Sequence, residues 1–402
     1  MMVANNPSVE NTVLGVLATT VVHAAGHGSA ALWDAVARGR TGLRPNHLGW
    51  CDLPCWIGAV PGVDDTVLPT ALQPWDCRNH RLAWMALQDE AFRQVIDAAL
   101  ARHGPHRIGL VLGTSTSGMR STEPAYARRR STGEWPVDFS YRGSHALDAL
   151  CRFSARVLGL QGPLATLSTA CSSSAKVFLT AQRWIAAGLV DAEVVGGVDS
   201  LCLSTLHGFD ALQLLSDDRC RPFDVARKGI SVGEAAGFVL LGRAPAAVSF
   251  VGGGESSDAW HMSTPHPQGL GAQEAMQSAL AAAGLAPADI GYVNAHGTAT
   301  PANDRSEAAA LAAVFGERGV PVSSTKGVTG HALGAAGIVE AIITTLALER
   351  QALPPSANLD QPDPALALDL VRVPRATALR HAMSNNFGFG GSNCTLIFGL
   401  SA

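Results

Sequence analysis

The stretch 165–184, ATLSTACSSSAKVFLTAQRW, places a single cysteine, Cys171, where an apolar run stops and a helical pattern begins. The apolar side chains after it recur at helical spacing on one face: Val177, Phe178, Ala181, Trp184 and Ile185. A cysteine at a helix start faces unpaired backbone N–H groups and the positive end of the helix dipole, which favour thiolate over thiol. Buried, inert cysteines are also common at such positions. This stretch alone therefore leaves Cys171 either a nucleophile or a small core residue.

Short runs rich in β-branched and small residues surround this stretch. We expect buried strands at 107–115, 163–169, 192–200 and 235–243, and an earlier first strand within 12–26. Strands that alternate with helical segments are typical of βαβ units, in which helices cover the sheet. The sequence therefore predicts an α/β fold.

A second round of the same alternation begins near Ala246. It predicts a strand from 247, a helix at 272–284, a strand at 290–298, helices at 304–316 and 334–350, and two strands with a glycine turn at 381–400. Each round has a small-residue turn after a strand, at Cys171 and at 387–391. We predict two similar halves, residues 1–245 and 246–402, that meet near the segment RAPAA.

The composition excludes several classes of protein. Of the 402 residues, 47% are hydrophobic and only 15% are charged, which favours packed layers over disorder. The formal net charge of −4 gives no general bias toward nucleic acid. The apolar run at 12–26 follows Glu10, lacks a basic flank and is too short for a membrane span. We expect no nucleic acid partner and no membrane span.

The 8 cysteines are scattered along the chain, and no secretory signal indicates an oxidising compartment. Cys51 and Cys55 form one C-x3-C pair without a second pair, which argues against a zinc site there. We expect free thiols and a cytoplasmic protein.

Two polar loops carry further candidates for chemistry. NAHGTATPANDRSE at 294–307 contains His296, and STKGVTGHALGAAGIVE at 324–340 contains Lys326, His331 and Glu340. Active-site loops of α/β proteins gather directly after strands, where both histidines are predicted. Cys171 and two histidines could also bind a metal, but no pair has the usual ligand spacing, so we expect none. No glycine-rich stretch has phosphate-loop spacing, which argues against nucleotide binding.

The ordered motifs resemble those of β-ketoacyl-[acyl carrier protein] synthases. They are STACSSSA at 168–175, RPFDVARKGISVGEAAG at 221–237, the two loops above, and NNFGFGGSN at 385–393. The resemblance covers nearly the whole chain. It implies the thiolase fold, in which two similar halves stack as five αβαβα layers, usually in a homodimer.

The resemblance also assigns roles to matching residues. Cys171 would hold an acyl chain as a thioester, received from the phosphopantetheine of an acyl carrier protein. His296 and His331 would bind the thioester oxygen of the malonyl group while carbon dioxide leaves, and the enolate would attack the acyl group. Two neutral imidazole donors stabilise the negative charge that develops on that oxygen. Lys326 and Glu340 could set the protonation state of these histidines.

The remaining site residues follow from the same motifs. The backbone N–H groups of Cys171 and Phe389 would form the oxyanion hole, and Phe389 matches the gate residue beside the cysteine. The resemblance places four more residues in substrate binding: Thr298, Thr300, Phe387 and Gly390. No cofactor is implied, since the carrier protein brings its own phosphopantetheine.

Two segments depart from the common family pattern. Lys228 and Ile230 stand where an aspartate and a phenylalanine are usual, and the segment 112–130, LGTSTSGMRSTEPAYARRR, differs from its glycine-rich counterpart in housekeeping enzymes. Both segments help to shape the acyl entrance or pocket, so chain-length preference is open. We expect a specialised type II enzyme, such as one that builds aryl polyene pigments.

Other functions remain as alternatives. A non-catalytic subunit like a chain length factor would lack the nucleophilic cysteine, which this chain keeps, although a heterodimer with such a subunit is possible. A degradative thiolase would use a second cysteine where this chain has NNFGFGG. An acidic carrier protein could bind Arg128–Arg130 with Arg120 and Arg142, or these side chains could be ordinary solvated charges.

Overall fold

The computed structural model describes residues 12–401, so Glu10 and the outer ends of the two predicted halves lie outside it. Within this range, two sets of strands have the same order and the same relative directions. The first set runs β1 (Leu14–His23), β9 (Ala235–Gly242), β7 (Ala192–Asp199), β5 (Ile108–Gly113) and β6 (Leu164–Leu167). The second runs β10 (Val248–Ser257), β17 (Ser392–Leu400), β16 (His381–Phe387), β11 (Ile290–Asn294) and β12 (Pro321–Ser323).

In both sets the first three strands are antiparallel neighbours and the last three are parallel. The predicted similarity of the halves is therefore a similarity of topology. β1 and β10 pair antiparallel at Leu14–Phe250 and Gly15–Ser249, which joins the two sets by hydrogen bonds. The boundary near 245 falls between β9 and β10 but stays a prediction, because the two parts share one core.

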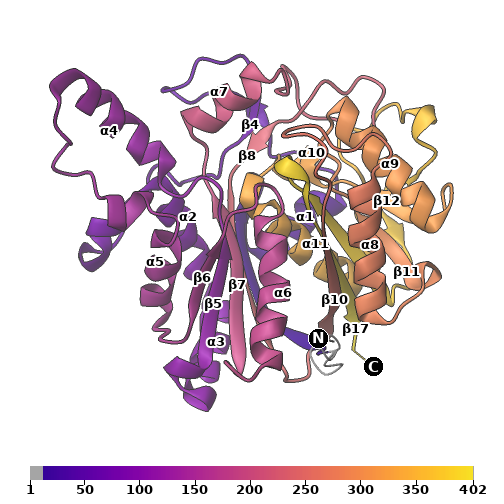
Figure 1. Cartoon of the computed structure of the whole chain (residues 1–402), viewed down its shortest axis with the longest axis horizontal. Helices are drawn as coiled ribbons and strands as arrows, with labels where there is room; N and C mark the ends of the chain where they lie inside the picture. The colour runs from indigo at the N-terminus through magenta and orange to yellow at the C-terminus, as the bar shows by residue number, and fades with distance from the viewer. Residues whose placement is uncertain (1–11, 402) are drawn as a thin grey trace, which may run out of the picture.

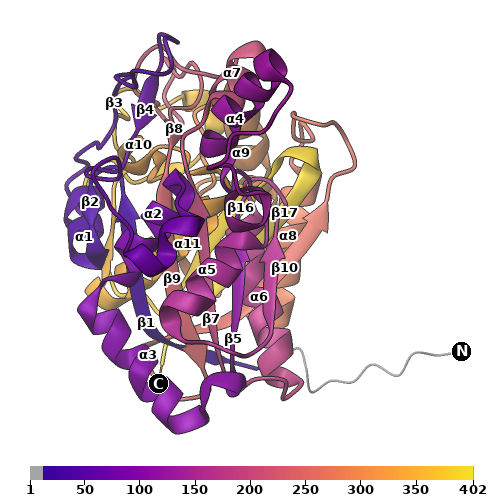
Figure 2. The ribbon, with the colours of Figure 1, turned by 90° about the vertical axis from the view of Figure 1, so that its left-hand side faces the viewer.

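We call the two sets of strands the first and the second sheet. Helices cover both of them and fill the space between them (Figure 1). Outside the first sheet lie α2 (Arg78–Leu87), α3 (Glu90–His103) and α5 (Ala149–Leu158), which Figure 2 shows in front of the strands. Outside the second sheet lie α8 (Leu270–Ala283) and α9 (Pro301–Phe315). Between the sheets lie α6 (Ser173–Ala186) and α11 (Ala336–Arg350). This confirms the five αβαβα layers that the resemblance implied.

The burial pattern explains why α11 occupies the middle layer. All its residues from Ala336 to Leu348 are buried, as expected for a mostly apolar helix that is covered on every side. α6 begins very close to its neighbours: a side-chain Cβ at Gly113 or Gly337 would lie 2.5 Å from the backbone nitrogen of Ser174 or Ala175. These glycines let the N-terminus of α6, next to Cys171, sit against β5 and α11.

Smaller elements complete the chain. They are β2 (Gly26–His27), α1 (Gly28–Ala37), β3 (Arg44–Pro45), β4 (Trp56–Gly58), α4 (Met119–Thr132), α7 (Leu203–Ala211), β8 (Val232–Gly233), α10 (Lys326–Thr329), β13 (Ala352–Leu353), β14 (Asp369–Leu370) and β15 (Arg375–Ala376). Figure 1 shows α4 standing out from the body at the upper left. Among residues 12–401, no helix has the length and apolar character needed to cross a membrane.

The predicted elements occur where the sequence placed them, with shifted ends. The strand predicted at 290–298 stops at Asn294, which leaves His296 in a loop. The helix predicted from 304 begins at Pro301, because the Thr300 hydroxyl accepts from Asn303 N and caps it.

Candidate active site

Cys171 lies in the turn between β6 and α6, at the carboxyl end of the parallel strands. Ala170, which precedes it, has a φ of 51°, so the chain turns sharply at this point. The cysteine is only 6% exposed, and it lines a cavity. The turn thus aims the cysteine into the cavity, as expected for a strand-to-helix nucleophile turn.

His331 is the direct neighbour of Cys171, with Nε2 2.9 Å from Sγ. Burial raises the pKa of the Cys171 thiol to about 12, although the charge of Lys326 and the backbone amide of Phe389 act in the opposite direction. The expectation that the helix start favours thiolate is therefore wrong for the resting site. Lost hydration disfavours the thiolate in the resting site, so the thiol must transfer its proton as it reacts.

His296 stands beside His331, with ring centroids 5.3 Å apart and nearly perpendicular planes. Burial, and then the charge of Lys326, lowers the pKa of both imidazoles well below the ordinary value. Both rings are therefore neutral at neutral pH. This is the state that a hydrogen-bond donor to a developing oxyanion requires.

Lys326 and Glu340 form a buried ion pair behind His296. Nζ of Lys326 lies 3.4 Å from Nδ1 of His296 and donates to the carbonyl of the same residue. Because an ammonium group can only donate, Nδ1 accepts, and the imidazole proton resides on Nε2. Neither member of the ion pair is among the residues that line the cavity.

The backbone around His296 is held by a residue to which the sequence analysis gave no role. The carboxylate of Glu307, on α9, accepts from the amides of His296 at 2.8 Å and Gly297 at 2.7 Å. Glu307 ends the quoted loop motif 294–307. Its position, an acidic residue in the helix directly after the loop of His296, was the signal by which the sequence could have indicated this role.

The glycine-rich turn between β16 and β17 closes another side of the cavity. Phe387, Phe389 and Gly390 all line it, and the Phe389 ring lies 5.6 Å from that of Phe209. The backbone amide of Phe389 is directed at Cys171 and lowers the pKa of its thiol. The predicted gate and oxyanion-hole residue is therefore beside the nucleophile.

The sequence analysis missed a loop that packs on this turn. Gly390 N donates to Met262 O at 2.8 Å, and Asp258 N donates to Gly391 O at 3.0 Å. The carboxylate of Asp258 also accepts from Asn393 Nδ2. The loop after β10 is thus tied to the gate turn by backbone contacts, for which no side-chain motif gives a signal.

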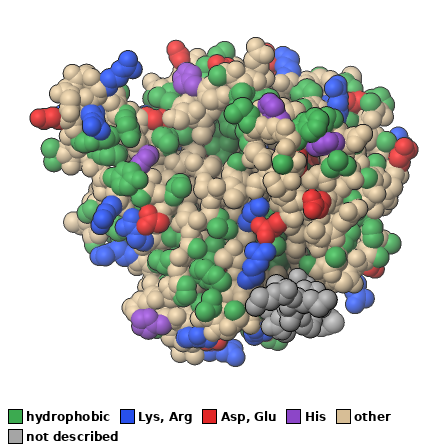
Figure 3. Space-filling view, in the orientation of Figure 1, with side chains coloured by type: hydrophobic (Ala, Val, Ile, Leu, Met, Phe, Trp, Pro, Cys, Tyr) green, Lys and Arg blue, Asp and Glu red, His purple; other side chains and the backbone are tan. Residues whose placement is uncertain are grey.

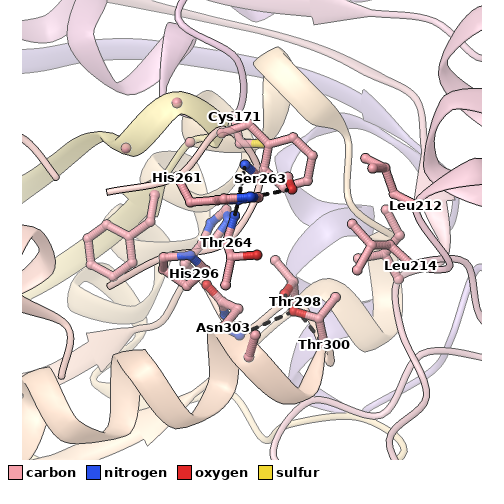
Figure 4. A pocket seen from close by; sticks show the side chains of 18 of the residues that line it. Cys171, Leu212, Leu214, His261, Ser263, Thr264, His296, Thr298, Thr300 and Asn303 are labelled. Atoms are coloured by element: carbon pink, nitrogen blue, oxygen red, sulfur yellow. Dashed lines mark hydrogen bonds between the residues drawn. The ribbon is translucent and has the colours of Figure 1, made fainter. Parts of the chain in front are cut away.

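The cavity has a volume of about 140 Å³ and has two unlike sides. Figure 4 shows Leu212 and Leu214 on one side, with His261 and Ser263 on the other. Further lining residues are Cys171, Phe209, Ile230, Asp258, Thr264, Pro265, His296, Thr298, Thr300, Ala302, Asn303, His331, Phe387, Gly388, Phe389, Gly390, Gly391 and Asn393. Every predicted site residue except Lys326 and Glu340 therefore lines one cavity.

Thr298 and Thr300 have hydroxyls 3.0 Å apart in this cavity. The Thr300 hydroxyl is already used in the cap of α9, which leaves Thr298 the freer of the two for a substrate. The ligand atoms of Cys171, His296 and His331 all lie within 4.8 Å of one another, although they are remote in sequence. That no metal belongs here stays a prediction.

Comparison with known proteins assigns the family. The family model described as "Beta-ketoacyl synthase, N-terminal domain" matches residues 74–247, and the model of its C-terminal domain matches residues 248–360. The chain belongs to the beta-ketoacyl synthase family. It is a ketosynthase, an acyltransferase that acts as a condensing enzyme.

Curated relatives and solved structures agree with this ketosynthase assignment. The 3-oxoacyl-[acyl-carrier-protein] synthase 2 of Vibrio cholerae is 38% identical over 312 residues, 73% of this chain and 75% of that protein. Nodulation protein E of Rhizobium meliloti is 38% identical over 304 residues, with the same coverage of both. A chain of the complex between a ketosynthase and its chain length factor from Xenorhabdus doucetiae is 37% identical, with a TM-score of 0.87 and full coverage of both chains.

Proposed function

We propose that this ketosynthase condenses malonyl-[acyl carrier protein] with an acyl chain held on Cys171, in a specialised type II pathway such as aryl polyene synthesis. The observation that carries the proposal is the contact of 2.9 Å between Cys171 Sγ and His331 Nε2, with His296 beside both. The product would be a 3-oxoacyl-[acyl carrier protein] two carbons longer than the acyl chain.

The first half-reaction loads the cysteine. Sγ attacks the thioester carbon of the acyl carrier protein, its proton passes to His331, and the carrier thiol leaves with that proton. The high pKa of the buried thiol supports this coupled transfer, since a free thiolate is rare at neutral pH. Nδ1 of His331 has no hydrogen-bond partner among residues 12–401, so either tautomer is accessible to this ring.

The second half-reaction forms the carbon–carbon bond. The malonyl thioester loses carbon dioxide, and the electrons of the broken bond form an enolate whose oxygen is stabilised by donation from His296 and His331. The enolate carbon then attacks the acyl thioester, the C–S bond breaks, and Cys171 leaves as a thiolate that takes up one proton from solvent to return to the thiol. Lys326 supports the donor role of His296, because it keeps the proton on Nε2.

The pathway and partners rest on further observations. Lys228 and Ile230 depart from the common pattern, and Ile230 lines the cavity. The matching complex contains a ketosynthase and its chain length factor, so we propose either a second copy or such a subunit as partner. The free edge of β6, the last strand of the first sheet, with Leu164 exposed, is a suitable interface. All 8 cysteines are free and buried, which suits the cytoplasm.

The test is acyl-enzyme formation. We expect the ketosynthase incubated with acyl carrier protein substrates to gain the mass of one acyl group, and Cys171→Ala to gain none and to condense nothing. Cys151→Ala, which removes a buried thiol remote from the cavity, should still acylate. A Cys171→Ala protein that condenses at the wild-type rate would refute the proposal, and the masses of the products identify the chain length.

A further inference from the structure

Asp199, the last residue of β7, is a buried carboxylate with an unusual set of partners. It is fully buried, and it has no salt bridge within the described part of the chain. Six neutral groups donate to its two oxygens: the hydroxyls of Thr114, Ser115 and Thr116, and the amides of Ser115, Thr116 and Gly334. An ionised carboxylate so deep in the protein is tolerated only because these donors replace its hydration.

The donors come from two separate segments. Thr114, Ser115 and Thr116 follow β5. The amides of Ser115 and Thr116 and the hydroxyls of all three surround the carboxylate as a nest. Gly334 comes from the turn that begins at His331, and its amide donates to Oδ2 at 2.6 Å. Asp199 therefore connects the loop after β5 to the turn that carries a site histidine.

This turn approaches Asp199 as closely as its backbone allows. A Cβ on Gly334 would lie 2.7 Å from Oδ2 of Asp199 and 2.9 Å from the amide nitrogen of Ser115. The preceding Leu333 has a φ of 53°, a conformation that costs energy for a residue with a side chain. The contact with Asp199 offsets this cost and holds the turn in place.

His331 depends on its backbone more than His296 does. Lys326 holds the His296 ring through Nδ1, whereas Nδ1 of His331 has no partner among the described residues. Within the described structure, the ring of His331 makes a single hydrogen bond, to Sγ of Cys171. Its backbone is fixed on one side by Ser231 O and Gly233 N, and on the other by the turn that ends on Asp199.

We propose that Asp199 is a positioning residue for the condensation reaction, which keeps Nε2 of His331 in reach of Cys171 and of the substrate oxygen. This proposal rests on the proposed catalytic roles of Cys171 and His331. Asp199 touches no reacting atom. Its charge also raises the pKa of Cys171, which places it within electrostatic reach of the nucleophile.

The test compares two buried acids on the same strand. Asp199→Asn replaces one carboxylate oxygen by an amide NH2, which cannot accept. With the remaining oxygen held by the amides of Ser115 and Thr116, the NH2 faces the Gly334 amide, which loses its acceptor, and the turn shifts. We expect kcat of condensation to fall by about 10²-fold, the loss typical of a small misplacement, while KM for the carrier-protein substrate is unchanged. The matched control, Glu193→Gln, replaces a second buried acid of β7, whose carboxyl has no hydrogen-bond partner among residues 12–401, and should keep the wild-type kcat.

Two readouts separate positioning from a loss of folded protein. The fraction of chains acylated on Cys171 counts competent sites, and kcat is expressed per acylated chain. The ¹⁵N resonances of the His331 ring should move in Asp199→Asn and stay in place in Glu193→Gln. Folded Asp199→Asn protein with the wild-type kcat would overturn the proposal, whereas a wild-type protein that condenses nothing would overturn the proposed function instead.

A second variant covers the case in which Asp199→Asn does not fold. Gly334→Ala keeps the carboxylate and its charge but pushes the turn away from it. We expect the same fall in kcat with an unchanged KM. A folded Gly334→Ala protein as active as the wild type would likewise rule out the positioning role.

Discussion

At the scale of the residue, the neighbours of the reactive groups matter more than their types. Cys171 looks activated by a helix start in the sequence, yet burial raises the pKa of its thiol to about 12. The two histidines are kept neutral by burial and by the charge of Lys326. The three groups that face the substrate, Cys171, His296 and His331, are therefore neutral. Contacts with charged neighbours, such as that of Lys326 with His296, set their donor and acceptor roles.

Removing Lys326 should change the pH dependence of decarboxylation. Its positive charge lowers the pKa of His296, so in Lys326→Met this pKa rises and the ring becomes protonated at higher pH. We expect the acid limb of the rate profile with malonyl-[acyl carrier protein] to move to higher pH, with a lower maximum.

The variant also leaves Glu340 without its cation, which destabilises the buried carboxylate. The double variant Lys326→Met/Glu340→Gln removes both charges and serves as the control for folding. An acid limb at the wild-type position in both proteins would contradict this account of His296.

At the scale of the element, α4 is the part of the chain that departs most visibly from a compact body (Figure 1). Glu123 joins it to the N-terminus of α7 by accepting from the amides of Leu203 and Ser204. Its outer part carries Arg128, Arg129 and Arg130, all exposed, and Figure 3 shows basic side chains at this upper left edge.

Charge reversal on α4 tests whether it binds the acidic carrier protein. We expect Arg128→Glu/Arg129→Glu to raise KM for the carrier-protein substrate with kcat unchanged, because rim charges act mainly on association. Added salt should reduce the difference from the wild type.

Arg102→Glu, an exposed position on α3, is the control for net charge. Equal KM values for the α4 variant and the wild type would show that these arginines are ordinary solvated charges.

At the scale of the whole molecule, the layers bury polar groups that the chemistry does not use. Glu193 in β7 is fully buried, neither of its oxygens has a hydrogen-bond partner in the described structure, and burial raises its pKa to about 9. In the folded state this carboxyl therefore stays protonated at neutral pH, whereas in the unfolded chain it ionises near its ordinary value of 4.5.

The protonated state of Glu193 makes the stability of the folded protein depend on pH. Between about pH 4.5 and 9 the folded state binds one proton more than the unfolded state, so stability falls as pH rises. The side chain in Glu193→Gln does not titrate, so this variant lacks the contribution of Glu193 to the pH dependence of stability. We expect its free energy of unfolding, measured with urea, to exceed that of the wild type at pH 8.5 by a margin, on the order of 1 kcal/mol or more, that shrinks toward pH 5. A constant difference between the two proteins across this range would contradict a protonated Glu193.

Much of the fold could be predicted from the sequence, because hydrophobic periodicity is a local property of the chain. The buried strands at 108–113 and 192–199, and the helix at 173–186, occur where their patterns placed them. Their ends were less certain, since the cap by Thr300 and the early end of β11 depend on contacts that propensity does not encode. Of the site, the motifs gave the cysteine, the two histidines, the ion pair and the gate turn. The loop after β10 that also lines the cavity, and the roles of Glu307 and Asp199, had to be found in the fold.

The sequence by itself determined the alternation of strands and helices, the reactive residue types and the family resemblance, because these lie in short contiguous motifs. Only the tertiary structure decided that Cys171 and His331, 160 positions apart, would lie in contact. It also decided their protonation, since burial and the position of Lys326 arise when two sheets close on α6 and α11. Charge and proximity between distant residues are properties of packing, and no local pattern records them.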